Sequence, residues 1–376
     1  MRKSRMDGGT LMEMKFPEKG FAGKVVLKDG DKDVSWLWIQ DMDVSFSGHA
    51  VKTGGIAGVG TENEHRGKGY SRKILTSSVA LMKKHKVPLS LLYGIRYYYT
   101  RYGYAVVYPD YRAGVHVFFA KRLPQPKGYV WRKIEPDDMP AVIRLYNKTC
   151  WPRTGMRARD PGKYRFFKGS NWNAVPEPFG LFRKGKLCAY TVLDLKPDGV
   201  EVVDTASASY EDSMALVSCL AAEAVARCTS DIILHLPPDF PLVIACRRFG
   251  GELRVGFEAD GGAMARIIHL ESFLTQIAPL LKERAGHGWS ALFDTGDQRA
   301  LIKMSKSGAE VARAKKSAKA TVTIKTTPGG LAQLFYGYRP LDEMCLAGHA
   351  AVKGKAGLAE KFFHTEWAHM MLTDHF

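Results

Sequence analysis

The sequence predicts a mixed α+β protein with more than one domain. Its 376 residues exceed the roughly 100 to 200 residues of a single domain. Hydrophobic residues make up 45% and charged residues 25% of the chain, a balance typical of globular proteins and not of disordered ones. Short β-rich runs alternate with amphipathic helical patterns in two successive stretches, and a third stretch has a different order. We therefore expect two α/β units of similar order, followed by a third domain.

The first unit is expected over residues 1–123. Residues 24–59 contain β-rich runs separated by Gly and Asp, which is typical of an antiparallel meander. A helix of about three to four turns is predicted to begin near Tyr70, because apolar residues recur there at helical spacing after a glycine-rich turn. The remaining expected elements are a buried strand at 89–94, a short helix at 97–104 that turns at Gly103, and a strand at 114–123.

The second unit is expected over residues 129–270, because the segment 123–128 concentrates Pro and Gly where the pattern starts again. Its expected elements are a helix in 134–149, two or three strands in 181–204, a helix in 213–227, a strand at 231–236 and closing strands near 250 and before 270. The third domain is expected over residues 271–376. It should contain helices at 272–285, 331–337 and 359–372, with strands near 300–306 and 320–326.

Composition excludes several classes of protein. The chain has neither an apolar run of membrane-spanning length nor an apolar signal region after its basic N-terminus, so we expect a cytoplasmic protein without a membrane span. Six scattered cysteines without a CxxC pair argue against a disulfide framework or a zinc site. The net charge of +17 favours an anionic partner, whether nucleic acid, an acidic surface or a phosphate-bearing ligand.

The most informative motif is the loop from Arg66 to Ser71, whose residues are Arg66, Gly67, Lys68, Gly69, Tyr70 and Ser71. Glycines allow successive backbone N–H groups to point inward, the start of a helix adds partial positive charge, and the Arg and Lys side chains add full charges. Such a loop can hold a pyrophosphate without a metal ion. A solvated basic turn that caps a helix is the alternative for these residues alone.

The order of strand 54–61, this loop, the helix, strand 89–94 and the tyrosine-rich segment 97–104 resembles the acetyl-CoA core of the GNAT N-acetyltransferases. The family loop pattern is [R/Q]xxGx[G/A]; Arg66 takes its first position and Gly69 its fourth, whereas Ser71 departs from the Gly or Ala of the sixth but is still small. With the second α/β unit and the C-terminal segment LAQLFYGYRPLDEMCLAGHAAV, the chain more specifically resembles the Eis (enhanced intracellular survival) acetyltransferases over residues 24–376.

That resemblance implies two tandem GNAT folds followed by a sterol carrier protein-like domain, with acetyl-CoA as co-substrate of the first fold and no metal. It also implies a homo-oligomer, a hexamer in the family, and a small-molecule amine acceptor of the aminoglycoside, polyamine or lysine-like class. In the second unit, the corresponding segment 204–213 lacks Arg, Lys and Gly. We therefore expect that unit to be structural.

The resemblance also assigns catalytic roles. Tyr99 is implied as the general acid that protonates the leaving thiolate, although spacing alone does not distinguish it from the neighbouring tyrosines 97, 98, 102 and 104. The carboxylate of the C-terminal residue, Phe376, is implied as the general base. Aromatic and apolar residues continue close to the end of the chain, which favours a docked terminus over a frayed one. Val59, Thr61 and Arg72 are implied as further cofactor contacts.

The acceptor site, other possible ligands and a competing function have still to be considered. The first strand and paired helices that usually open a GNAT fold are not evident before Arg66, so the acceptor site, for which Asp41, Asp43, Glu366 and Asp374 are candidate acidic residues, is undefined. The histidines 364, 369 and 375 lack metal-ligand spacing, and the basic segment 303–325 lacks the interleaved aromatics of a nucleic-acid site, so we expect neither a metal nor a nucleic acid. A catalytically degenerate CoA- or lipid-binding protein is the competing function.

Overall fold

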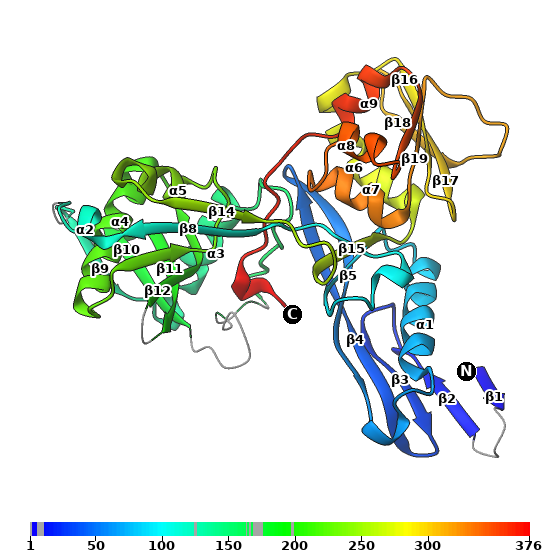
Figure 1. The fold of residues 1–376 in the computed structure, drawn as a ribbon, viewed down its shortest axis with the longest axis horizontal. Helices are drawn as coiled ribbons and strands as arrows, with labels where there is room; N and C mark the ends of the chain where they lie inside the picture. Colours follow the sequence, from blue (N-terminus) through cyan, green and yellow to red (C-terminus); the bar gives the residue numbers. More distant parts are fainter. Residues whose placement is uncertain are drawn as a thin grey trace. The chain divides into compact units, whose positions relative to one another are not determined.

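The computed structural model describes residues 2–5, 11–123, 126–162, 164, 167, 176–196 and 199–376. The chain forms two compact units, each built from segments that are distant in the sequence. The first unit comprises Met1–Val107, Ala259–Glu366 and Phe376, and the second comprises Tyr108–Glu258 and Trp367–His375. Figure 1 labels the helices and strands within each unit.

The first unit contains an eight-stranded sheet in the order β1-β2-β3-β4-β5-β6-β15-β7. Its long strands β3 to β5 are antiparallel, as the sequence predicts, and β6 then lies parallel to β5. The strands are β1 (Arg2–Arg5), β2 (Leu11–Lys15), β3 (Gly23–Asp29), β4 (Lys32–Phe46), β5 (His49–Thr61), β6 (Leu89–Gly94), β7 (Ala105–Val106) and β15 (Gly262–Ile267). From residue 11 to residue 62 the described backbone forms strands and no helix.

Helix α1 (Tyr70–Lys84) connects β5 to β6 and begins at the predicted residue. It buries Ile74, Leu75 and Met82 in the same apolar core as Val25 and Leu27 of the sheet. The periodicity of these apolar side chains therefore sets which face of the helix meets the sheet.

A second, five-stranded sheet of the first unit has the order β18-β17-β16-β19-β20. The helices predicted from 272 and from 331 and the strands predicted near 300 and 320 are confirmed. The elements are β16 (Trp289–Asp294), β17 (Arg299–Met304), β18 (Ala309–Arg313), β19 (Val322–Lys325), β20 (Ala351–Gly354), α6 (Leu270–Ala285), α7 (Pro328–Phe335), α8 (Leu341–Leu346) and α9 (Ala356–Phe362).

The helix predicted over 359–372 is wrong in its second half. Helix α9 ends at Phe362, and Phe363 already has extended backbone, with φ −114° and ψ 111°. Residues 367–375 belong to the second unit, where Met371 is part of the apolar core. The apolar side chains of this segment are thus buried by tertiary packing of an irregular chain and not along one helix face.

The second unit contains a seven-stranded sheet in the order β14-β8-β13-β12-β11-β10-β9. Like β5 and β6, strands β12 and β13 are parallel and are connected by a helix, α4, so the predicted repetition of the βαβ order is present. The elements are β8 (Asp110–His116), α2 (Val117–Ala120), β9 (Tyr129–Lys133), α3 (Met139–Thr149), β10 (Glu177–Arg183), β11 (Lys186–Lys196), β12 (Gly199–Ser207), α4 (Tyr210–Ala226), β13 (Asp231–Leu234), α5 (Pro241–Cys246) and β14 (Glu252–Gly256).

Two strands belong to different units from those expected. The strand predicted at 114–123 begins at Asp110 as β8, ends at His116 before α2, and pairs with β13 and β14 of the second sheet. Strand β15 was expected to close the second unit but pairs with β6 and β7 of the first sheet. Both strands are short, and their sequences do not specify which sheet they complete. The expected boundary at 123–128 includes residues 124 and 125, which lie outside the described residues.

Among the described residues, no helix combines the length and the apolar character needed to cross a membrane.

Candidate active site

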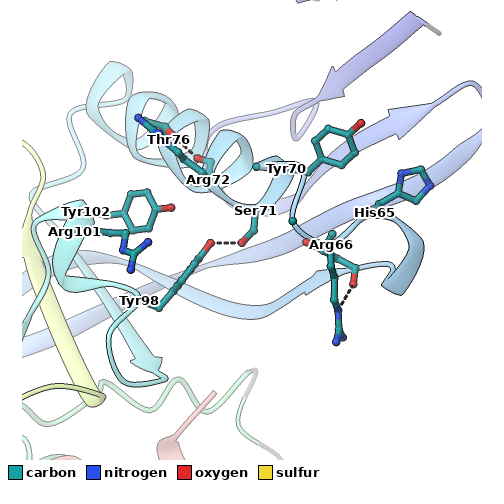
Figure 2. Close-up of a pocket in the computed structure, with 12 residues that line it drawn as sticks. His65, Arg66, Tyr70, Ser71, Arg72, Thr76, Tyr98, Arg101 and Tyr102 are labelled. Carbon is teal, nitrogen blue, oxygen red and sulfur yellow. Dashed lines mark hydrogen bonds between the residues drawn. The ribbon is translucent and has the colours of Figure 1, made fainter. Parts of the chain in front are cut away.

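A pocket of about 710 Å³ lies in the first unit at the N-terminal end of α1. Figure 2 shows the side chains around it, which come from the end of β5, the following loop, the first turns of α1 and the tyrosine-rich segment after β6. The lining residues are Thr61, His65, Arg66, Gly67, Gly69, Tyr70, Ser71, Arg72, Thr76, Tyr98, Arg101 and Tyr102.

The glycine loop gives the pocket its anion-binding character. Gly67 and Gly69 both have left-handed backbone, with φ 76° and 75°, which residues with a side chain rarely adopt. Gly69 is the N-cap of α1, and the first intrahelical bond runs from the Lys73 N–H to the Gly69 carbonyl at 3.1 Å. The N–H groups of the first turn therefore have no partner within the helix and face the end where the helix dipole is positive.

The side chains of the loop are not equivalent. Arg66 and Arg72 line the pocket, and Arg66 Nε donates to the Thr61 carbonyl at 3.4 Å (Figure 2). Lys68, which the sequence predicts as a contact, is exposed and does not line the pocket. Ser71 lies in the lining although it departs from the family pattern.

Strand β5 presents an open edge beside this loop. Its parallel pairing with β6 covers Thr53–Ile56, whereas the described pairings of its last residues are with β4. A β-bulge in this final stretch has Gly58 in left-handed backbone, with φ 57°. Thr61 lines the pocket and Val59, on the same strand, is half-buried beyond it. This edge offers backbone groups to an extended ligand in the manner of an added strand.

The sequence did not single out the tyrosine that borders the loop. Tyr98 and Ser71 form a hydrogen bond between their hydroxyls, as Figure 2 shows. The Arg101 guanidinium lies 5.8 Å from the Tyr98 ring centre, and the Tyr102 ring lies 5.5 Å from it. Together with His65 and Thr76, these residues complete the lining. The crowding of tyrosines in the sequence was the signal for this group, but only the fold indicates which of them face the loop.

Tyr99, the predicted acid, lies beneath this group and is 7% exposed. Its ring packs over Gly94 at the end of β6, where a Cβ atom would lie 2.5 Å from Tyr99 Cδ2. Burial, and secondarily the neighbouring Tyr98, raises the pKa of Tyr99 to about 12. The phenol therefore keeps its proton throughout the neutral range.

Phe376, the predicted base, is half-buried against the same sheet. Its ring lies edge-on to Tyr93 of β6 with a centroid distance of 5.7 Å. It also covers Gly55 of β5, where a Cβ atom would lie 2.7 Å from Phe376 Cε2. The absence of a side chain at Gly55 is therefore what allows the terminal ring to lie on the strand.

Tyr99 and Phe376 approach the sheet from opposite faces. Successive residues of a strand point to opposite faces, and Gly94 faces Tyr99 whereas Tyr93 faces Phe376. Both contacts occur close to the point where the pairing of β5 with β6 ends, after Ile56 and Leu92. Groups from the two faces can thus approach one ligand that lies between the separating strands.

The acidic residues that the sequence offered for an acceptor site all have basic partners. Asp41 and Asp43 both contact Lys52, at 3.0 and 3.4 Å. Glu366 pairs with Arg284 and Asp374 with Arg159. Each of these carboxylates therefore lies beside a basic side chain, although Asp41 and Asp43 share the single Lys52 and Asp374 shares Arg159 with Asp204. Within the described part of the chain, no group of three or more His, Cys, Asp or Glu side chains has the arrangement of a metal site.

The second unit lacks this loop geometry at the start of α4. Its N-cap is Ser209, whose hydroxyl accepts from the Asp212 N–H at 3.1 Å and donates to the Asp212 carboxylate at 2.6 Å. The first turn is acidic, with Glu211 beside Asp212. These groups already satisfy the helix terminus and would repel a phosphate.

Comparison with known proteins agrees with this geometry. Residues 11–107 match the family described as the acetyltransferase (GNAT) domain, and no curated protein matches the sequence. Among solved structures, the fold is similar to a GCN5-related N-acetyltransferase from Anabaena variabilis, with a TM-score of 0.72, 16% identity and coverage of 94% of this chain and 90% of that one.

Two further structures cover 94% of this chain. One is a GCN5-related N-acetyltransferase from Kribbella flavida, with a TM-score of 0.68, 18% identity and 87% of its own length covered. The other is Eis1 from Mycobacterium abscessus, with a TM-score of 0.66, 15% identity and 90% of its own length covered. At these identities the likeness is one of fold. With the matched family and the pocket at α1, it shows that the chain carries a GNAT-type N-acetyltransferase domain.

Proposed function

We propose that the protein transfers the acetyl group of acetyl-CoA to a primary amine of a small molecule, of the aminoglycoside, polyamine or lysine-like class. The observation that carries this proposal is the pocket at α1, with two left-handed glycines and two arginines around the unpaired N–H groups of a helix start. A pyrophosphate fits this site, because the helix start offers backbone N–H donors and the two arginines offer positive charge. Arg66 and Arg72 and the N–H groups of residues 67–71 would hold it, while Val59 and Thr61 would bind the extended arm.

In this proposal Tyr99 is the general acid. Acetyl-CoA supplies the acetyl group as a thioester, so a thiolate must be protonated when the amine displaces it. A buried phenol with a pKa of about 12 is fully protonated at neutral pH and can donate to a thiolate within hydrogen-bond distance. Burial also removes competing water from the phenol.

The α-carboxylate of Phe376 is the general base of the proposal. An amine attacks only as its neutral form, so a nearby acceptor must take a proton. A carboxylate is a weak base in water, but a fixed position beside the reacting amine offsets weak basicity. The packing of the Phe376 ring against Gly55 and Tyr93 supports a fixed terminus over a frayed one.

The remaining expectations follow from the Eis resemblance and form part of the proposal. The chain would comprise two tandem GNAT folds, of which the second is structural, and a sterol carrier protein-like domain from residue 271. It would act in the cytoplasm as a homo-oligomer such as a hexamer. The two βαβ repeats, β5-α1-β6 and β12-α4-β13, support the tandem arrangement.

The competing proposal is a catalytically degenerate protein that holds CoA or a lipid. The described backbone has no helix from residue 11 to residue 62, where a GNAT fold usually has helices that shape the acceptor site. Binding without turnover would follow if no other element replaces them.

Thiol release from acetyl-CoA against a panel of amines tests the proposal. We expect turnover with at least one amine, and a loss of about 10²-fold or more in Tyr99→Phe with unchanged CoA affinity. Tyr104→Phe is the matched control, because Tyr104 is also a buried phenol with a pKa raised to about 12 but donates to Ser90 Oγ at 2.8 Å. CoA binding without turnover for any amine would favour the competing proposal. The absence of CoA binding would refute both the acetyltransferase and the CoA-binding protein.

A further inference from the structure

The tyrosine-rich segment 97–104 carries both the proposed acid and part of the pocket lining. It lies in the first unit, between β6 and β7. Tyr98, Arg101 and Tyr102 line the pocket, as Figure 2 shows, and the buried Tyr99 lies among them in the sequence. Because the segment lies outside the strands of the sheet, contacts from other parts of the chain must fix its path.

The segment begins with a strained residue. Tyr97 has left-handed backbone, with φ 61°, a conformation that bulky side chains rarely adopt. Tyr97 is also 78% exposed, so packing of its ring does little to stabilise this conformation. Strained residues persist only where the surrounding structure holds them, and they are concentrated at functional sites. The contacts of the Tyr97 backbone are therefore the ones to examine.

Asp260 supplies the first of these contacts. It lies just before β15, and its Oδ2 accepts from the Tyr97 N–H at 2.6 Å while its Oδ1 accepts from the Gly261 N–H at 2.8 Å. A Cβ atom at Gly261 would lie 2.9 Å from Arg96 Cγ, so the absence of a side chain there allows this close approach. Arg101 Nη2 donates to the Tyr97 carbonyl at 2.8 Å. Both backbone polar groups of Tyr97 are thus bound by side chains.

Arg266 of β15 holds the other end of the segment. Its Nη1 donates to the Tyr102 carbonyl. Its guanidinium lies over Gly103, where a Cβ atom would be 3.5 Å from Arg266 Cζ. The Arg266 Nη2 also donates to Asp297 Oδ2 at 3.4 Å, and the side chain is only 18% exposed. Arg266 is therefore itself held in the orientation that binds the segment.

The backbone between these two contacts includes Tyr99. Its carbonyl accepts from the Tyr102 N–H at 2.9 Å and from the Tyr104 N–H at 3.4 Å. The first of these bonds spans the 3-10 turn Thr100–Tyr102, for which Tyr99 is the N-cap. Tyr99 is thus joined directly to the residue whose carbonyl binds Arg266. A shift at that end of the segment would displace Tyr99 as well.

Both contacts come from one short stretch of chain, residues 260–266. The strand in this stretch, β15, pairs with β6 and β7, which are the strands on either side of the segment. We propose that Asp260 and Arg266 are positioning residues, which hold the tyrosine-rich segment so that the Tyr99 phenol is fixed for proton transfer to the thiolate. This inference rests on the proposed function.

Hydrogen exchange measured by mass spectrometry tests the holding contacts without reference to acetyl transfer. The amides of Tyr102 and Tyr104 donate to the Tyr99 carbonyl, so their exchange reports the opening of the turn. We expect exchange in residues 97–104 to be at least about tenfold faster in Arg266→Ala and in Asp260→Ala than in the intact chain. Arg266→Lys keeps the charge but not the forked donors, so its exchange rate should be intermediate.

Arg284→Ala is the matched control. Arg284 is another arginine of the first unit that donates to a distant backbone carbonyl, that of Phe362 at 2.8 Å, and pairs with a carboxylate, that of Glu366. Its side chain is 7% exposed, so its removal should perturb the unit at least as much as the removal of Arg266. We expect exchange in residues 97–104 to stay within about twofold of the intact chain, because substitutions at distant sites act independently.

Acetyl transfer then tests the positioning. With the amine found active, Arg266→Ala and Asp260→Ala should lower kcat about tenfold to 10²-fold, the loss expected when a catalytic group is misplaced by about 1 Å. The effect on the KM for acetyl-CoA should be smaller, because the glycine loop lies outside the segment. Arg266→Lys should recover part of the lost kcat, whereas Arg284→Ala should leave kcat unchanged.

Each outcome decides one part of the proposal. Exchange rates in Arg266→Ala and Asp260→Ala equal to those of the intact chain would overturn the holding contacts. Faster exchange with unchanged kcat would overturn the positioning role, as would an equal loss of kcat in Arg284→Ala. Inactivity of the intact chain with every amine would instead refute the proposed function, and the exchange rates would still decide the holding contacts.

Discussion

Gly55→Ala is the substitution that most specifically probes the placement of Phe376. A Cβ atom at this position would lie 2.7 Å from Phe376 Cε2 and 2.8 Å from Met42 Cε. Carbon atoms in contact are about 3.5 to 4.0 Å apart, so the terminal ring must move by about 1 Å. Overpacking of this kind costs about 1–3 kcal/mol in free energy of unfolding, and we expect the lower end, because the ring is half-buried.

The effect on turnover should be larger than the effect on stability. A misplacement of about 1 Å in a group that acts on the reacting atoms costs about 10²-fold in rate. The melting temperature should fall by about 2–4 °C for the loss of 1 kcal/mol. Thiol-release kinetics, calorimetric titration with CoA and thermal unfolding of the same preparation measure the three quantities.

Gly54→Ala is the control for this prediction. Gly54 faces the opposite side of β5, where a Cβ atom would meet the buried Met82 sulfur near the C-terminal end of α1. It should lower stability at least as much but leave turnover of the folded protein within about twofold, since the glycine loop lies at the other end of that helix. Equal turnover in Gly55→Ala and the intact chain would refute the role of Phe376 at this position.

Three further predictions concern the pocket and the buried tyrosines. Gly69→Ala, at a φ of 75°, should strain the start of α1 by about 1–2 kcal/mol and weaken acetyl-CoA binding roughly tenfold in calorimetric titration; unchanged affinity would contradict the loop assignment. Arg72→Gln should weaken binding and flatten its dependence on salt concentration, whereas an unchanged salt slope would remove Arg72 from the phosphate contacts. Burial raises the pKa values of Tyr99 and Tyr104 to about 12 from the ordinary 10, so these phenols keep protons that the unfolded chain loses. The free energy of unfolding should therefore fall as the pH rises from about 10 to 12. Denaturant unfolding across that range should show a shallower fall in Tyr104→Phe.

Local patterns in the sequence were sufficient to predict the elements that build the pocket. The helix begins at Tyr70 as its apolar spacing predicts, so residues 66–69 lie between β5 and that helix while Tyr70 and Ser71 form its first turn. The loop could be predicted because its left-handed backbone at Gly67 and Gly69 is one that few residue types other than glycine adopt. Lys68 was included on its charge, and it is exposed and not among the residues that line the pocket.

Features that depend on long-range pairing were not predictable. Strands β8 and β15 each pair with a sheet other than the one expected from their place in the sequence, because strand pairing is decided by long-range contacts. Tyr98 and Arg101 reach the pocket through the path of the segment after β6, and His65 through the 3-10 turn Asn63–His65 after β5, and no motif indicates either. Asp374 and Thr373 contact Arg159 and Asp204, which lie 215 and 169 residues away in the sequence, and no local pattern indicates these contacts.

A chain extended by two glycines after Phe376 tests the central claim most directly. The extension leaves every side chain in place but moves the α-carboxylate about 7 Å along the chain. Our account predicts unchanged CoA affinity and a loss of about 10²-fold or more in thiol release with the active amine. Thiol release equal to that of the unextended chain would contradict the account, because the terminal carboxylate would then have no part in the reaction.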